Sequence, residues 1–133
     1  MRSVEECYRG SEVRVFRLDR AGTVERLRTR THEILGRRPD VVAIWLFGSL
    51  ARGNAVPGSD ADLYVIVRDA AVEPLERGVD LARQFSGVGI GCDVIVHTES
   101  EHRDRVARDD AFVRVILREG ICLARREAGR LST

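Results

Sequence analysis

The sequence contains no lysine, so all 22 of its basic residues are arginine. The base composition of the genome is the simplest cause, but the absence excludes some chemistry. A lysyl-nucleotide intermediate, a Schiff base and the lysine of a P-loop are all ruled out. Any phosphate group has to be bound by arginine, by backbone N–H groups or by a metal ion.

Long apolar runs, paired cysteines and an excess of one charge are also missing. No stretch is long enough to span a bilayer, and the first residues lack the apolar core of a signal peptide, so we expect a cytoplasmic protein with no membrane contact. Cys7, Cys92 and Cys122 have no metal-ligand spacing, which predicts reduced thiols. Since the net charge is +1, nothing in it favours direct nucleic-acid binding.

The length and the hydrophobic pattern predict one globular domain of the α/β (α+β) class. A chain of 133 residues buries roughly two thirds of its unfolded surface, enough for one core without disulfides. We expect this domain over residues 20–126, an N-terminal extension over 1–19 and a flexible tail over 127–133. Apolar runs rich in β-branched residues predict strands, at residues 40–47, 60–67, 92–97 and 121–126.

Helical periodicity predicts three helices, over residues 22–40, 73–85 and 99–120. Thr23 is a candidate cap of the first, whose apolar face includes Leu27 and Ile34. The second is amphipathic, with its apolar face expected at Leu75, Val79, Ala82 and Phe85.

Less regular segments lie between these elements and at the N-terminus. Residues 48–59 read as a loop that opens with a helical turn capped by Ser49. Residues 13–18 alternate as in a strand.

Two aspartates lie at the start of the second strand, where an apolar run would otherwise be expected to continue. Asp60 and Asp62 are one residue apart, so their side chains point to the same face of the strand. Two like charges there repel and are costly to desolvate unless a cation lies between them, and oxygen ligands suit Mg²⁺ or Mn²⁺. If the third strand pairs beside the second, Asp93 joins the cluster, and three carboxylates can hold two ions about 4 Å apart.

The Gly48-Ser49 pair ends the first strand and complements the acids. Glycine lets the backbone approach an anion closely, and the Ser49 hydroxyl and nearby amides can donate to phosphate oxygens. Arg52 follows one turn later, where it is either a ligand of the outer phosphates or a plain surface residue. The layout is neither a Walker loop nor an EF-hand, because the residues those motifs need are missing.

The motif "GSLARGNAVPGSDADL" resembles the signature of the nucleotidyltransferase superfamily that includes DNA polymerase beta. In detail it is similar to the minimal nucleotidyltransferases, the MntA-like antitoxins of MNT–HEPN toxin–antitoxin systems. The resemblance covers about residues 22–124 and implies a short mixed β-sheet flanked by helices. It implies that Asp60, Asp62 and Asp93 are catalytic metal ligands, of which Asp93 also helps to activate the acceptor hydroxyl, and that Gly48 and Ser49 bind nucleotide phosphates.

The resemblance also implies a reaction and a partner. ATP would bind with two Mg²⁺ ions, and its AMP group would be transferred to a tyrosine of a HEPN-type RNase toxin, which the modification silences. The chain would then be a protein adenylyltransferase that acts as an antitoxin. The sequence does not distinguish a homo-oligomer from a hetero-oligomer.

Two other functions stay open. The chain could be an interaction module of the same fold that blocks a toxin by occupancy, or it could modify a small hydroxyl compound such as an aminoglycoside. Enzymes of the second kind usually carry an added helical domain, and about forty residues after Asp93 are too few for one.

Several aromatic and histidine residues have plainer interpretations. Trp45 and Phe47 fit a core better than a base-stacking platform, because they lie within the apolar run. His97 fits a hydrogen-bonded residue at a strand end, and His102 fits a solvent-facing position on a helix.

Overall fold

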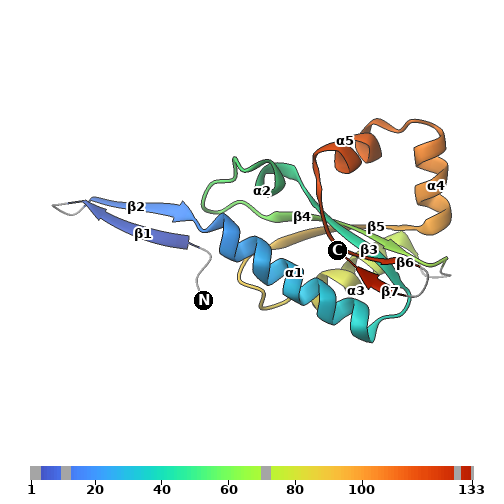
Figure 1. The fold of residues 1–133 in the computed structure, drawn as a ribbon. Coiled ribbons are helices and arrows are strands. Elements are labelled where there is room, and N and C mark those ends of the chain that lie inside the picture. The colour runs from blue at the N-terminus through green and yellow to red at the C-terminus, as the bar shows by residue number, and fades with distance from the viewer. Residues whose placement is uncertain (1–3, 10–12, 70–72, 128–129, 133) are drawn as a thin grey trace.

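The computed structural model describes residues 4–9, 13–69, 73–127 and 130–132. It contains twelve elements in chain order (Figure 1), which are β1 (Val4–Arg9), β2 (Val13–Leu18), α1 (Arg20–Arg37), β3 (Val41–Phe47), α2 (Gly48–Arg52), β4 (Ala61–Val67), α3 (Pro74–Gln84), β5 (Cys92–Thr98), α4 (Glu99–Ala107), α5 (Ala111–Glu119), β6 (Ile121–Glu127) and β7 (Arg130–Ser132). No helix in the described ranges is long and apolar enough to cross a membrane.

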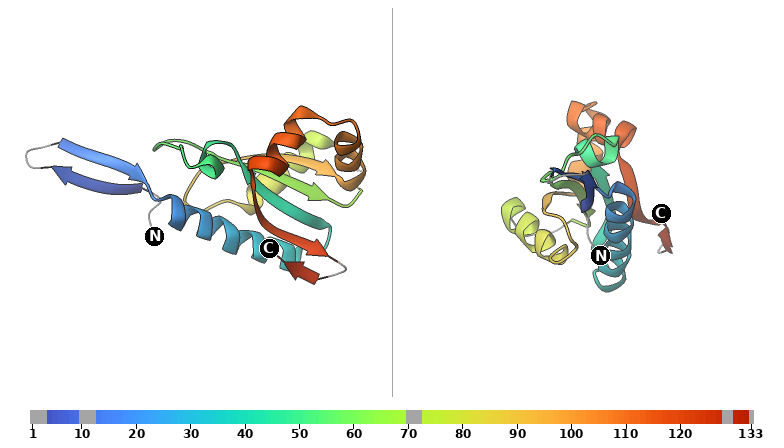
Figure 2. Two further views of the ribbon diagram at one scale, coloured as in Figure 1. Left: turned by 45° about the horizontal axis from the view of Figure 1, so that its top comes forward. Right: turned by 90° about the vertical axis from the view of Figure 1, so that its left-hand side faces the viewer.

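The main sheet has five strands in the order β5-β4-β3-β6-β7. Strands β4 and β5 are parallel, and the other neighbours are antiparallel, so the predicted short mixed sheet is confirmed. Helices α1 and α3 cover one face, and α4 and α5 cover the other (Figure 2). The four predicted strands are all present, with ends that differ by about one residue.

Strand β4 lies between these two helical layers, and its burial explains its sequence. The last five of its seven residues, Leu63 to Val67, are all buried. Leu63 and Val65 pack toward α1 and α3, while Tyr64 and Ile66 pack in a separate cluster beneath α5. A strand buried on both faces gains from apolar side chains at every position, so its sequence is a continuous run rather than an alternation.

Helix α1 confirms the predicted apolar face but not the predicted cap. Leu27 and Ile34 are fully buried. Asp19, rather than Thr23, caps the helix, because its carboxylate accepts a hydrogen bond from the Gly22 N–H at 3.1 Å. Thr23 lies inside the first turn and is buried.

The segment expected to be one helix over residues 99–120 is two helices. Asp109 has a left-handed φ of +55°, which interrupts the helical path between α4 and α5. Asp110 then caps α5, since its carboxylate accepts from the Val113 N–H at 3.0 Å. The two consecutive aspartates are therefore the break, which was concealed because Val106 before it falls in helical register with Val113 after it.

Helix α3 is amphipathic, but its predicted apolar face is only partly buried. Leu75 is 80% exposed and Val79 is 46% exposed, whereas Phe85 is buried as predicted. Leu81, which was not predicted, is buried as well. Arg77 is also buried, because its guanidinium pairs with the carboxylate of Glu101 on α4 at 3.0 Å. A charged residue that apolar periodicity would not place inside is thus buried, because it has a partner on another element.

Additional strands lie near both ends of the chain: β1 and β2 precede α1, and β7 follows β6. Residues 13–18 form the predicted strand, which pairs with β1 in an antiparallel hairpin that extends away from the main sheet (Figure 1). At the other end, β7 pairs with β6.

Candidate functional site

The strand register gathers the predicted acids at one end of the sheet. Asp62 lies level with Asp93 in the parallel pair of β4 and β5, and level with Phe47 in the antiparallel pair of β4 and β3. Asp60 comes immediately before β4, beside Gly91, whose carbonyl accepts a hydrogen bond from the Ala61 N–H at 2.8 Å. We expected Asp93 to join the other two acids only if β5 pairs with β4, and the structure shows this pairing.

Two glycines leave room for these carboxylates. Gly48 has a left-handed φ of +78°, and a Cβ added there would clash with the carboxylate of Asp62. A Cβ added at Gly91 would lie 2.5 Å from Oδ1 of Asp60. At both positions a side chain would displace an acid, and at Gly48 the left-handed backbone also favours glycine.

The bend between β3 and β4 starts with the short helix α2. This is the predicted helical turn, but Ser49 is its second residue rather than its cap, and Phe47 flanks it without a capping side-chain hydrogen bond. Gly48 and Ser49 are half-buried and Arg52 is exposed, so the bend is open to solvent rather than covered by packed side chains.

The acids influence one another electrostatically. The pKa of Asp62 is raised, first by burial and then by the negative charges of Asp93 and Asp60, while the guanidinium of Arg52 opposes the shift. Asp60 and Asp93 are themselves exposed. Crowded negative charge of this kind is relieved when a cation binds.

The acids fit a divalent cation in donor chemistry and in register. Carboxylate oxygens on two neighbouring strands are the ligand type that Mg²⁺ and Mn²⁺ prefer. In the part of the chain that the structure describes, however, no three histidine, cysteine or acidic side chains already meet closely enough to hold an ion. The acids therefore fit a divalent cation by ligand type and by strand position. Their side chains would have to change rotamer to coordinate one ion together.

Two hollows meet the strand end that carries the acids. One, of about 650 Å³, contains Gly48, Ser49, Arg52 and Asp62 and is closed on its other side by α5. Asp93 instead lines a hollow of about 660 Å³ along β5 and α3. Asp60 lies in neither of these two hollows. Asp62 and Asp93, although level in the sheet, therefore line two different hollows.

Arg20, which no sequence motif indicated, links α1 to the bend at α2 through two hydrogen bonds. Its Nε donates to the carbonyl of Leu50 and its Nη2 to the carbonyl of Ala51, each at 2.9 Å. These carbonyls lie near the end of α2, where C=O groups have few partners within the helix, although that of Leu50 also accepts from the Gly53 N–H at 3.3 Å. Because Arg20 is thirty residues away from Leu50 in the chain, a local pattern could not have identified it.

A buried polar network lies behind the site on the same face of the sheet. The Tyr64 hydroxyl lies 3.0 Å from Nδ1 of His97 and 2.8 Å from Nδ1 of His102. A phenol has one proton to donate, so one of the two imidazoles must donate its Nδ1–H to the oxygen. The expected hydrogen bonding of His97 is confirmed, but His102 is half-buried rather than solvent-facing.

Burial controls the charge of this network. It raises the pKa of Tyr64 and is the largest cause of the lowered pKa of His97 and the cause of the lowered pKa of His102. The network is therefore held in its neutral form.

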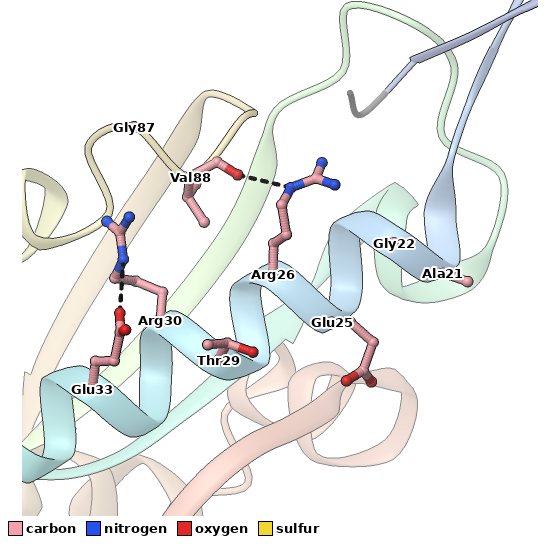
Figure 3. Close-up of a pocket in the computed structure, with 9 residues that line it drawn as sticks. All are labelled: Ala21, Gly22, Glu25, Arg26, Thr29, Arg30, Glu33, Gly87 and Val88. Carbon is pink, nitrogen blue, oxygen red and sulfur yellow. Dashed lines mark hydrogen bonds and ion pairs between the residues drawn. The ribbon is translucent and has the colours of Figure 1, made fainter. Parts of the chain in front are cut away.

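Another hollow, of about 640 Å³, lies on the opposite helical layer between α1 and the turn at Gly87 and Val88 (Figure 3). Arg26 donates from Nε to the Val88 carbonyl at 3.1 Å, and its Nη1 is buried without a hydrogen bond. Arg30 pairs with Glu33 at 3.3 Å. This hollow contains none of the predicted site residues, and its two arginines are balanced by two glutamates.

Comparisons with known proteins identify a family match. The model of the family described as "Polymerase beta, Nucleotidyltransferase" matches residues 30–128. Over 46 residues, 34% of this chain, the sequence is 39% identical to a CCA-adding enzyme of Pyrobaculum neutrophilum, of which the match spans 11%.

Solved structures share the fold. A Sulfolobus solfataricus protein with a provisional nucleotidyltransferase assignment superposes with a TM-score of 0.58 at 22% identity, over 83% of this chain and 86% of that one. A toxin–antitoxin structure with AMP-PNP gives a TM-score of 0.48 at 21% identity, over 72% of this chain and 71% of that one. A TM-score this low does not support a comparison of function.

Proposed function

This chain belongs to the polymerase beta nucleotidyltransferase family, and we propose that it transfers AMP from ATP to a hydroxyl group of a partner protein. The observation that carries the proposal is the register of β4 and β5, which puts Asp62 level with Asp93 beside the Gly48 bend. Carboxylates in that position can bind cations next to a nucleotide whose phosphates lie on the bend.

The proposed phosphate site uses the donors that a chain without lysine has available. The triphosphate lies on the backbone of Gly48 and Ser49, where a glycine at φ +78° permits a close approach. The Ser49 hydroxyl donates to a phosphate oxygen, and the exposed guanidinium of Arg52 binds the outer phosphates. Arg20 supports this bend from α1 through its two hydrogen bonds to α2 carbonyls.

Asp60, Asp62 and Asp93 are the proposed ligands of two divalent cations, Mg²⁺ or Mn²⁺. When bound, such cations neutralise charge at the α-phosphate and acidify an acceptor hydroxyl. The support in this chain is the mutual repulsion of the acids, which contributes to the raised pKa of Asp62.

The proposed reaction exchanges one P–O bond for another. The acceptor oxygen attacks the α-phosphorus, the bond from that phosphorus to the bridging oxygen breaks, and pyrophosphate leaves. Asp93 orients the acceptor hydroxyl from β5 and accepts its proton, which passes to solvent. Arg52 stabilises the charge that develops on the departing pyrophosphate.

The proposed acceptor is a tyrosine of a HEPN-type RNase toxin, which makes this chain an antitoxin that acts by AMPylation. The support is the resemblance of residues 48–63 to the MNT antitoxins. The match to the CCA-adding enzyme spans 11% of that enzyme, so its activity is not carried over to this chain.

The test is transfer of label from ATP marked at the α-phosphate to the toxin, in the presence of Mg²⁺. Asp60→Asn and Asp62→Asn should each reduce transfer by about a hundredfold or more, because metal-assisted charge stabilisation is lost. Asp104→Asn is the matched control, since Asp104 is an exposed carboxylate on α4 that pairs with Arg108. Label that persists in both site variants would overturn the metal assignment.

The same variants separate the enzyme from an interaction module. If Asp62→Asn abolishes labelling but the variant still neutralises the toxin in cells, occupancy rather than catalysis protects the cell.

A further inference from the structure

The hollow beside the Gly48 bend has two chemically different ends. The polar end contains Ser49, Arg52 and Asp62. The far end, toward α5, is apolar and is formed by Phe47, Ala111, Phe112, Val115 and Ile116. None of these five side chains has a polar atom, so the side chains of the far end favour contact with an apolar part of a ligand.

Phe112 forms a fixed platform at the apolar end. Its ring meets Phe47 edge-on, with centroids 5.4 Å apart and an interplanar angle of 89°. Tyr64 makes a second edge contact with it, at 6.2 Å and 85°. These contacts set the orientation of the ring, yet Phe112 remains 36% exposed and Val115 beside it 38% exposed. An aromatic ring held by its neighbours and open to a hollow is suited to stack on a planar group.

We infer that the nucleobase of the nucleotide substrate stacks on Phe112 and Val115, an inference that rests on the proposed function. The base is joined through its ribose to the same phosphates that the polar end would bind, and both ends belong to one hollow. The acceptor has to approach the α-phosphorus opposite the departing pyrophosphate. Asp93, which would orient the acceptor, lines the separate hollow along β5 and α3.

The chemistry of the platform determines how selective it is. Stacking is tolerant of base identity, because every base has a π face. An apolar wall also discriminates only weakly between bases that differ in their polar substituents. The chain should therefore use ATP and GTP with similar affinity, and should bind pyrimidine nucleotides less tightly because their rings are smaller. The partner protein, rather than the base, would then determine the specificity of the reaction.

The decisive experiment compares two ligands that differ in having a base. Calorimetry in Mg²⁺ would measure the binding of ATP and of inorganic tripolyphosphate to the full chain. Phe112→Ala should weaken ATP binding about tenfold, the typical loss of one stacking contact. It should change tripolyphosphate binding by no more than about twofold, because that ligand contacts the polar end alone. Phe112→Trp keeps a stacking surface and should retain ATP binding.

Leu117→Ala is the matched control for this substitution. Leu117 lies on the same helix, is 40% exposed and lines a different hollow, of about 340 Å³. It should leave the affinity for both ligands unchanged. Thermal unfolding of each variant checks that the fold is intact.

The possible results test either the base site on Phe112 or the proposed nucleotidyl transfer. Unchanged ATP binding by folded Phe112→Ala overturns the base site, and so does a loss of acceptor labelling with ATP binding intact, which would assign the platform to the acceptor. A preference of about a hundredfold for ATP over GTP overturns tolerant stacking. Failure of the wild-type chain to bind either ligand overturns the proposed function as well.

Discussion

The two faces of the sheet differ in how they are built. Among the residues that the structure describes, the face toward α1 and α3 rests on a cluster of nineteen buried apolar residues, whereas the cluster beneath α5 has five. The second face instead contains the Tyr64 network and the hollow beside Asp62. Burial of apolar surface on the first face stabilises the fold, and the second is left free to hold polar groups and an open site.

Matched substitutions of two fully buried isoleucines should give the largest difference in stability. Ile34 lies on α1 in the large cluster and Ile116 on α5 in the small one. Each change to alanine should cost about 2–5 kcal/mol of unfolding free energy, with Ile34→Ala near the upper end because more packed neighbours lose contacts. Urea unfolding measures both. A larger cost at Ile116 would mean that the α5 face, too, is a principal core.

Two glycines with similar backbones compare the site with an ordinary turn. Gly48 and Gly58 have φ values of +78° and +93°, so alanine strains both by about 1–2 kcal/mol. An alanine Cβ at Gly48 also meets the Asp62 carboxylate, whereas nothing lies within 4 Å at Gly58. Gly48→Ala should therefore reduce nucleotidyl transfer at least about tenfold. Gly58→Ala should leave transfer nearly unchanged, and equal losses would remove the role assigned to the bend.

Helix α4 tests whether polar contacts alone can hold an element on the second face. It has no buried residue, and its Glu101 pairs with Arg77, which is 6% exposed, and bonds the Thr98 N–H at 2.8 Å. Glu101→Gln keeps a capping side chain but leaves the buried guanidinium without a counter-charge, at a cost of about 1–3 kcal/mol. Glu99→Gln in the same turn should cost less. Urea unfolding compares the two, and equal effects would mean that the ion pair contributes little.

The same contrast explains how far the sequence predicts the fold. The strands were predictable because β-branched apolar runs bounded by glycine or aspartate have few alternatives in a small domain. The face of α3 was not, since Arg77 is buried by a partner on α4 that no local pattern reveals. The break at Asp109 and Asp110 was concealed because Val106 on α4 falls in helical register with the apolar residues of α5.

The candidate site divides in a similar way. The spacing of Gly48, Asp60 and Asp62 was readable because these residues are near in sequence. The position of Asp93 depended on one assumption, that β5 pairs with β4, and the register agrees with it. Arg20 and Phe112 act across distances in the chain that no periodicity spans, so they became evident from the structure. The metal and phosphate roles stay predictions.

Removing one hydroxyl tests the network that distinguishes the second face. Tyr64→Phe keeps the buried ring but takes away the oxygen shared by His97 and His102. The imidazoles then lose a hydrogen-bond partner in a half-buried place, which should cost about 0.5–1.5 kcal/mol. Urea unfolding measures the change. A neutral or stabilising result would show that water replaces the hydroxyl without loss.

Mild acid should weaken the second face alone. Burial lowers the pKa of His97 and His102 in the folded protein, so the unfolded chain binds protons more readily once the pH falls below about 6.5. Stability should accordingly be full above that pH and decline as the pH falls through the folded-state values. Glu101, whose pKa is lowered to about 2 by Arg77 and the Thr98 N–H, stays ionised meanwhile. Urea unfolding between about pH 7 and pH 5 measures the slope, which His97→Gln/His102→Gln should flatten. An equally steep slope in that double variant would place the sensitive groups elsewhere.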